Sequence, residues 1–246
     1  MKLALALAAC LALSVLNPWV GLGSLLLFLF VATTQPGLRI YGPAITRVPR
    51  DVVLTFDDGP HPDSTEPLLA ALREAGARAT FFVLVDRAEQ HPDLMRAIAA
   101  EQEVGLHGLG HHPWLTLWSP ERGAEELREA VRRLQAITGQ PVRWYRPPFG
   151  MTSPRLTRAV ELAGLTTVWC SLRTNDGVLG GDERLVRACQ RAEQGDIVLL
   201  HEGPRSAPRV LPRVLERLGQ EGLRCVTVGE ALGSDPAAGV TEVSPS

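Results

Sequence analysis

The sequence lacks several features that would each point to a particular class of protein. The formal net charge is only −2 over 246 residues, so the chain has no excess of positive charge with which to bind nucleic acid. Its four cysteines are scattered, without a CxxC pair or the spacing of a zinc ribbon, which argues against a disulfide framework. Internal repeats are absent as well. The length is that of one domain of ordinary size with an extra segment.

Charge is also missing locally, because residues 3–33 contain no charged side chain. Such a run is typical of a segment that lies in a lipid bilayer. Asn17 and Pro18 divide it into apolar stretches that are each short for a hydrocarbon core of ~30 Å, although the whole run is longer than one span needs. Residues 1–34 are therefore predicted to be a membrane segment, either a kinked span or a helical hairpin. A cleaved secretory signal is a third interpretation, but no small-residue cleavage site follows the second stretch.

The rest of the chain divides by composition into a linker, a folded domain and a tail. Prolines, glycines and arginines in residues 35–49 indicate the linker, and residues 233–246 have the composition of a flexible tail. Residues 50–232 are predicted to form the domain. Within it, short β-branched or aromatic runs indicate strands at 52–56, 79–84, 104–106, 143–146, 166–170, 196–201 and 224–228. Amphipathic stretches indicate helices at 65–75, with Asp63 as its cap, and at 121–138, 154–163 and 183–193.

The alternation of these strands and helices predicts an α/β domain with a parallel sheet and right-handed connections. An open, doubly wound sheet and a small closed barrel both fit this pattern, and the pattern does not choose between them. In either architecture, reactive side chains gather at the carboxyl ends of the strands.

The strand at 52–56 runs directly into two adjacent carboxylates, Asp57 and Asp58. Adjacent carboxylates repel one another, and strand geometry points them in different directions. We expect such a pair where one carboxylate binds a cation and the other transfers a proton. A solvated turn is the simpler alternative for these residues taken alone.

Two histidines follow the strand at 104–106. His107 and His111 are four residues apart, a spacing with which two imidazoles can reach one metal ion from a helical turn. Taken alone, such a pair more often lies on the surface or in the core. Together with Asp58, the pair would supply three protein ligands and leave one position for water, as in a catalytic zinc site.

Two further strand ends carry single candidates for the same site. Arg146 precedes two prolines that stiffen the following turn, so its side chain is held in place. His201 ends the buried apolar run 197–200, where an imidazole could donate or accept a proton near neutral pH.

The motifs TFDDGP, HGLGH, RPPFG and LLH, in this order, resemble the NodB-homology polysaccharide deacetylases, carbohydrate esterase family 4. The resemblance covers about residues 50–232. It implies a distorted (β/α) barrel of about seven parallel strands, here preceded by the membrane segment, and a divalent metal ion, most often zinc. The implied roles are a general base at Asp57, metal ligands at Asp58, His107 and His111, an arginine that orients and tunes the base at Arg146, a general acid at His201 and an acidic partner of that histidine at Asp176.

The sequence departs from the family pattern at three positions. Gly108 stands where the family has Ser or Thr, a residue that supports the loop and binds no metal. Arg173 replaces the first acidic residue of the motif whose second acid is Asp176. Gly177 replaces an aromatic residue that walls the sugar groove. These changes leave the catalytic set complete and bear on substrate preference.

The function implied by the resemblance is hydrolysis of N-acetyl groups from sugars such as those of peptidoglycan, chitin oligomers or an exopolysaccharide. The enzymatic alternative is a deacylase of a membrane-lipid-linked sugar, which the apolar N-terminus and the absent groove aromatic favour. The alternative of another class is a catalytically silent carbohydrate-binding scaffold, against which the complete catalytic set argues. The expected location is the cell membrane with the domain outside the cytoplasm, although the arginines after residue 34 favour the opposite orientation.

Overall fold

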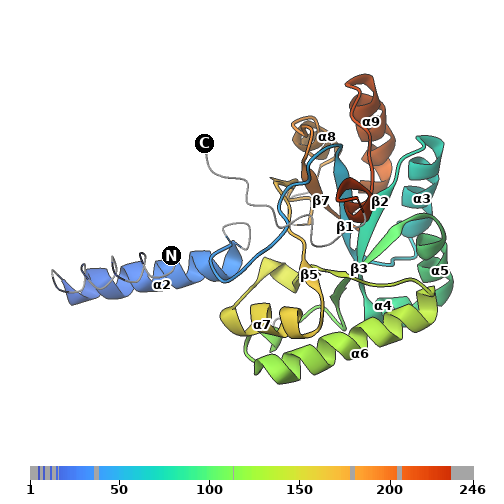
Figure 1. Ribbon diagram of the computed structural model, residues 1–246. Helices are drawn as coiled ribbons and strands as arrows, with labels where there is room; N and C mark the ends of the chain where they lie inside the picture. The colour runs from blue at the N-terminus through green and yellow to red at the C-terminus, as the bar shows by residue number, and fades with distance from the viewer. Residues whose placement is uncertain are drawn as a thin grey trace.

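The centre of the molecule is a sheet of seven parallel strands (Figure 1). The computed structural model describes residues 17–35, 39–112, 114–177, 181–203 and 207–233, together with Leu5, Ala8, Ala12 and Val15. The strands are β1 (Val53–Gly59), β2 (Ala79–Leu84), β3 (Glu103–Gly108), β4 (Trp144–Tyr145), β5 (Thr166–Thr167), β6 (Leu172–Arg173) and β7 (Ile197–His201). Their order across the sheet is β5-β4-β3-β2-β1-β7-β6, and each neighbouring pair is parallel.

Helices connect the strands and surround the sheet, except for the N-terminal α2, which precedes the first strand and extends away (Figure 1). They are α2 (Pro18–Thr34), α3 (Thr65–Glu74), α4 (Val85–Gln90), α5 (Pro92–Glu101), α6 (Pro120–Thr138), α7 (Pro154–Leu162), α8 (Asp182–Cys189), α9 (Ala207–Gln220) and α10 (Val228–Ala231). Alternate residues of β1, such as Leu54 and Phe56, share the larger hydrophobic cluster with Leu68 of α3, Met95 of α5 and Val214 of α9. This face of the sheet is therefore the one that the helices cover.

The opposite face of the sheet has a smaller apolar cluster of its own. Val53, Phe82 and Leu199 belong to it, and they alternate along their strands with residues of the larger cluster. Because both faces bury apolar side chains, the strands are nearly continuous hydrophobic runs, as parallel sheets require.

The sheet is curled. Its two edges are β5 and β6, which follow one another in the chain, so the connection between them must pass from one edge to the other. The segment 45–48 links the β5 edge to the start of β7, because the N–H of Ile45 donates to the carbonyl oxygen of Thr167 in β5 and the N–H of Val48 donates to that of Gly195 just before β7. The predicted parallel α/β architecture is confirmed in this curled form, and the predicted linker packs against the domain at its carboxyl end.

The strand predictions hold best where the apolar run is longest. The strand at 79–84 is confirmed to the residue, and those at 52–56, 104–106 and 196–201 correspond to β1, β3 and β7. The prediction at 224–228 is wrong, because only Cys225 makes an isolated bridge, to Val52, before Thr227 caps α10. The seventh strand is instead β6, a two-residue strand with no apolar run to reveal it.

All four predicted helices are present as α3, α6, α7 and α8, with ends that shift by a few residues. The predicted cap at Asp63 is wrong, because Ser64 occupies the cap position of α3. Helices α4, α5, α9 and α10 were not predicted. Helix α9 contains Pro212, a residue that is unfavourable inside a helix, and its apolar face packs on α3 and α8.

Helix α2 begins at Pro18, where the side chain of Asn17 accepts a hydrogen bond from the N–H of Trp19 over 3.0 Å. Figure 1 shows it extending away from the helices that surround the sheet. Among the residues that the structure describes, no helix is long and apolar enough to cross a membrane. The predicted membrane segment is thus not supported there. Most of its first half, residues 1–16, lies outside the described residues, as does the predicted tail after residue 233.

Candidate active site

A cavity of about 400 Å³ lies at the carboxyl ends of β1, β3 and β7. Five of the predicted site residues line it: Asp57, Asp58, His107, His111 and His201. The other two, Arg146 and Asp176, are buried behind the lining and contact Asp57 and His201 respectively. The structure therefore brings the seven predicted residues together, as parallel strands with neighbouring ends require.

Both adjacent carboxylates reach this cavity because β1 is irregular at its end. Strand alternation would send Asp58 to the helix-covered face together with Leu54 and Phe56. The register with β2 shifts between Asp57 and Gly59, and Asp58 takes a positive φ of 71°. Such a bulge re-aims a side chain, and a left-handed aspartate is an uncommon conformation that clusters at functional sites. Asp57 and Asp58 consequently line the same cavity. The prediction that strand geometry points them in different directions is therefore wrong.

Asp58, His107 and His111 form a group that could hold a metal ion, with all three ligand atoms within 4.8 Å of one another. Oδ1 of Asp58 lies 3.6 Å from Nε2 of His107 and 3.4 Å from Nε2 of His111. Ligands bound about 2.1 Å from a common tetrahedral centre would be separated by roughly these distances. Oδ1 of Asp58 is also buried without a hydrogen-bond partner among the described residues. A buried acceptor of this kind is suited to bind a cation.

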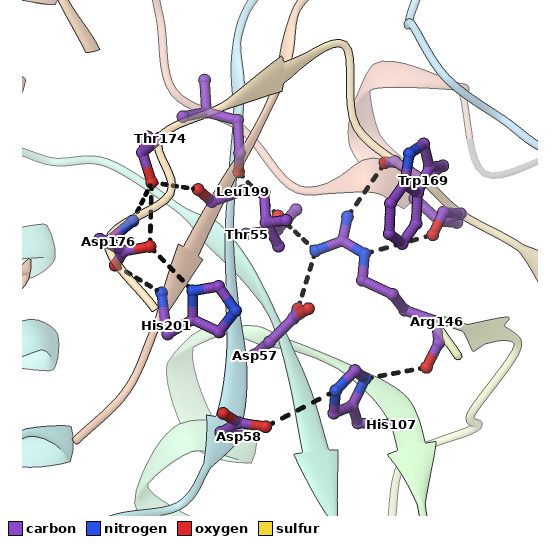
Figure 2. Close-up of polar contacts among 12 residues, drawn as sticks. Thr55, Asp57, Asp58, His107, Arg146, Trp169, Thr174, Asp176, Leu199 and His201 are labelled. Carbon is purple, nitrogen blue, oxygen red and sulfur yellow. Dashed lines mark hydrogen bonds and ion pairs between the residues drawn. The ribbon is translucent and has the colours of Figure 1, made fainter. Parts of the chain in front are cut away.

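The environment of His107 favours a metal-binding imidazole. Burial lowers the pKa of His107 and outweighs the nearby carboxylates, so the ring is neutral at neutral pH. Its Nδ1 lies 2.8 Å from the carbonyl oxygen of Arg146 and donates to it, as Figure 2 shows. This bond fixes the tautomer and leaves Nε2 free as a ligand.

The two histidines do not meet on a helical turn, and that part of the prediction is wrong. His107 is the penultimate residue of β3, and His111 lies in the loop that follows. Gly108 lets the chain turn between them, because it takes a φ of 131°, a conformation that other residues rarely adopt. The imidazole of His111 rests against Phe149, with ring centroids 4.1 Å apart.

A buried ion pair holds Asp57. Nη1 of Arg146, which is fully buried, donates to Oδ1 of Asp57 over 2.8 Å and to Oγ1 of Thr55 over 2.7 Å. The other nitrogens of the guanidinium donate to the carbonyl oxygen of Val168 and to that of Trp169, the second of which Figure 2 labels. A buried arginine with every branch bonded is rigid, and it fixes the carboxylate opposite it.

A second carboxylate holds His201. Nδ1 of His201 donates to Oδ1 of Asp176 over 2.8 Å, and the backbone N–H of His201 donates to Oδ2 over 3.0 Å. Burial by itself would lower the pKa of His201, but the hydrogen bond to Asp176, reinforced by the charge of Asp57, raises it above the ordinary value. His201 also lies opposite Asp57 in the register of β7 and β1.

Several lining residues were not singled out from the sequence. Phe149 is 57% exposed at the cavity and has a left-handed backbone, with a φ of 56°. Trp169 and Asn175 also line the cavity. Glu202, directly after His201, is buried, and its backbone N–H donates to the carbonyl of Asp57. The signal for Phe149 was its place in the RPPFG motif, whereas Trp169 is indistinguishable from a core aromatic in sequence.

Comparison with known proteins gives the family. The model of the polysaccharide deacetylase family matches residues 45–168. The peptidoglycan-N-acetylglucosamine deacetylase of Bacillus cereus is 31% identical over 188 residues, which cover 74% of this chain and 87% of that protein. The chitooligosaccharide deacetylase of Rhizobium leguminosarum bv. trifolii is 34% identical over 155 residues, which cover 63% of this chain and 72% of the relative.

A solved structure agrees with these relatives. The family 4 carbohydrate esterase from Streptomyces lividans, in complex with acetate, superposes with a TM-score of 0.67 at 32% identity. The match covers 72% of this chain and 92% of that one. The chain therefore belongs to the polysaccharide deacetylase family, carbohydrate esterase family 4, as its motifs had indicated.

Proposed function

We propose that the chain is a metal-dependent hydrolase that removes acetyl groups from N-acetylated sugars. The observation that carries this proposal is one cavity that contains an ion-paired carboxylate, a carboxylate-bound histidine and a three-ligand metal group. Amide hydrolysis needs a base for the attacking water, stabilisation of the oxyanion and a proton for the leaving nitrogen. The matched relatives are named for deacetylation of peptidoglycan and chitooligosaccharides, so we assign this chain the same class of substrate.

We assign the general base to Asp57. As water attacks the carbonyl carbon of the acetamido group, Asp57 accepts one of the water protons. Arg146 holds the carboxylate through Oδ1, so the second oxygen is available to receive that proton. Because the base is held in place beside the substrate, proton transfer from the attacking water becomes a step within one complex and needs no separate encounter.

We assign the general acid to His201. Its raised pKa favours the protonated imidazole, and Asp176 occupies its Nδ1. The proton on Nε2 is then free to pass to the amine nitrogen as the carbon–nitrogen bond breaks. The products are acetate and the free amino group of the sugar. Without this proton the amine would be expelled as an anion, which is a very poor leaving group.

The metal ligands in this proposal are Asp58, His107 and His111. A divalent ion bound there would lower the pKa of a water molecule and stabilise negative charge on the acetyl oxygen. We propose zinc, because two imidazoles and one carboxylate with an open fourth position form its usual catalytic ligand set.

We further propose that the enzyme works at the cell membrane, on its extracytoplasmic side. The support is the uncharged run 3–33 of the sequence and the peptidoglycan substrate named for a relative. The division into residues 1–34, 35–49, 50–232 and 233–246 belongs to the same proposal.

The experiment is a measurement of acetate release by the full chain. The substrates are N-acetylglucosamine oligomers and peptidoglycan glycan strands, assayed before chelation, after chelation and after addition of zinc. We expect release that chelation abolishes and zinc restores, with a loss of at least about 10²-fold in Asp57→Asn. Release that survives both chelation and Asp57→Asn would contradict the proposal. Bound metal without release from any substrate would instead favour the carbohydrate-binding scaffold.

A further inference from the structure

We propose that Arg173 forms an anion subsite in the catalytic cavity, so that the enzyme prefers N-acetylated sugars with a carboxylate or phosphate near the acetamido group. The proposal rests on the proposed function and specifies its substrate class. Arg173 is the only arginine among the described residues that line the cavity, and lysine does not occur there.

The position of Arg173 follows from strand register. Arg173 ends β6 and lies opposite Leu199 of β7, which also lines the cavity. Residues in register on neighbouring parallel strands point to the same face of the sheet. Leu199 in turn lies opposite Thr55, two residues before Asp57 on β1. The guanidinium therefore belongs to the same inner face as the proposed base.

The proposed base and the proposed acid of the cavity each have a charged partner in the protein. Asp57 pairs with Arg146, His201 pairs with Asp176, and Asp58 lies between the two histidines. Arg173 has no carboxylate within ion-pair distance in the part of the chain that the structure describes. A half-buried cation without a counter-ion attracts one from a ligand, because the surroundings screen it less than water would.

The guanidinium is also held in a defined orientation. Its central carbon lies 4.7 Å from the centroid of the Trp169 ring. Trp169 is only 5% exposed, and its carbonyl accepts a hydrogen bond from Arg146, so the indole is a fixed platform. Arginine that stacks on an aromatic face keeps its in-plane N–H groups for hydrogen bonds. Those groups match the two oxygens of a carboxylate or a phosphate.

The size of the cavity limits where the anionic group can be. About 400 Å³ accommodates a sugar-sized ligand, and the metal group and Arg173 line the same space. The charge must therefore lie on the sugar that loses its acetyl group or on its direct neighbour. Two sources have this chemistry: an ether-linked carboxylate, as on N-acetylmuramic acid, and the phosphate of a lipid-linked sugar.

The test compares substrates that differ only in the charge. Peptidoglycan glycan strands are assayed with free and with methyl-esterified lactyl carboxylates, and N-acetylglucosamine is assayed with and without a 1-phosphate. The full metal-loaded chain, Arg173→Gln and Arg173→Lys are compared by kcat/KM for acetate release. Arg122→Gln is the matched control, because Arg122 stacks on Trp118 at 4.0 Å but does not line the cavity.

We expect the native chain to favour the charged member of one pair and Arg173→Gln to reduce that ratio about tenfold. Arg173→Lys should keep part of the preference, and Arg122→Gln should keep all of it. The pair that responds identifies the carboxylate or the phosphate as the source. A native chain without a charge preference, or an equal loss on both members in Arg173→Gln, would overturn the subsite and leave the proposed function standing.

If no substrate releases acetate, the proposed function fails and calorimetric binding decides the subsite separately. N-acetylmuramic acid and N-acetylglucosamine 1-phosphate are titrated against N-acetylglucosamine. Charged ligands that bind about tenfold more tightly to the native chain than to Arg173→Gln would support the subsite. Equal binding to both proteins would overturn it.

Discussion

At the scale of single residues, the site consists of ionisable side chains whose neighbours determine their orientation and their protonation. Asp57 and Asp58 are neighbours in the chain, yet Arg146 holds the first while the second has only the histidines beside it. His107 and His201 are both buried histidines, and their pKa values shift in opposite directions. Burial lowers the pKa of His107. For His201, the hydrogen bond to Asp176 outweighs burial and raises the pKa. One histidine is thereby suited to a metal and the other to a proton.

Asp176→Asn tests the role of the second histidine. Removing the carboxylate removes the interaction that raises the pKa of His201, so the pKa should fall. A general acid must be protonated, and activity is lost as the pH rises through its pKa. We therefore expect the alkaline limb of the kcat/KM profile to move to lower pH, with roughly 10- to 100-fold less activity at about pH 8. An unchanged alkaline limb would mean that another group is the acid.

Glu202→Gln tests a buried carboxyl behind the site. Burial raises the pKa of Glu202 to about 7 from an ordinary 4.5, although hydrogen bonds from Thr65 and Ser64 oppose the shift. Between these values the folded chain holds a proton that the unfolded chain releases, so stability falls as the pH rises from 4.5 to about 7. The loss is about 3 kcal/mol above pH ~7.

Glutamine resembles the protonated carboxyl, so Glu202→Gln should lose less stability between about pH 5 and about pH 8 than the native chain. Urea unfolding at several pH values measures this difference. Glu74→Gln, at an exposed position of α3, is the control and should keep the native pH dependence. A parallel pH dependence in Glu202→Gln and the native chain would contradict the assignment.

At the scale of elements, the ends of β1 and β3 are where regular structure gives way to function. Register shifts interrupt the ladders between β1 and β2 at Asp57/Gly59 and between β2 and β3 at Val83/Leu84. The guanidinium of Arg87 in α4 donates to the carbonyl of Asp58 and so supports the first irregularity. Bulges of this kind are stable only where neighbouring groups hold them.

Gly108→Ala tests the second irregularity. The added Cβ would require a strained φ of 131° and would lie 3.2 Å from the carbonyl oxygen of Gly110. We expect the loop to shift and zinc affinity to fall about tenfold, measured by competition with a chelator. Gly139→Ala is the matched control, because its φ is also positive, at 67°, with open space around it. Equal affinity in the two variants would mean that Gly108 does not set the ligand geometry.

Features of this structure that depend on residues close together in the sequence could be predicted, whereas features that depend on tertiary contacts could not. The motif residues lie at strand ends, and parallel topology brings such ends together, so the proximity of the seven candidate residues could be predicted. The lining residues Trp169 and Asn175 could not, because nothing in the sequence distinguishes them from core or loop residues. The bulge at Asp58 could not be predicted from the sequence, because it depends on pairing with β2 and on the hydrogen bond from Arg87. Strand β6 was missed for the same reason, since two residues carry no periodicity and its pairing with β7 is tertiary.

At the scale of the whole molecule, a curled sheet surrounded by helices presents the candidate cavity at its carboxyl edge. The pattern of strands and helices predicts this class, and the family resemblance selects the barrel-like form over the open one. Curling depends on long-range pairs such as Ile45 with Val168, which no local pattern encodes. The sequence also predicts a membrane segment, which the described helices do not support.

Titration of zinc into the chelated full chain, with bound metal and acetate release measured in the same sample, most directly tests whether the Asp58, His107 and His111 group is catalytic. We predict that release rises in proportion to bound zinc and stops rising at about one ion per chain, as expected for a single three-ligand site. His111→Ala should require far more zinc for the same release. Acetate release that is independent of bound zinc, or that is unchanged in His111→Ala, would contradict the metal-dependent mechanism.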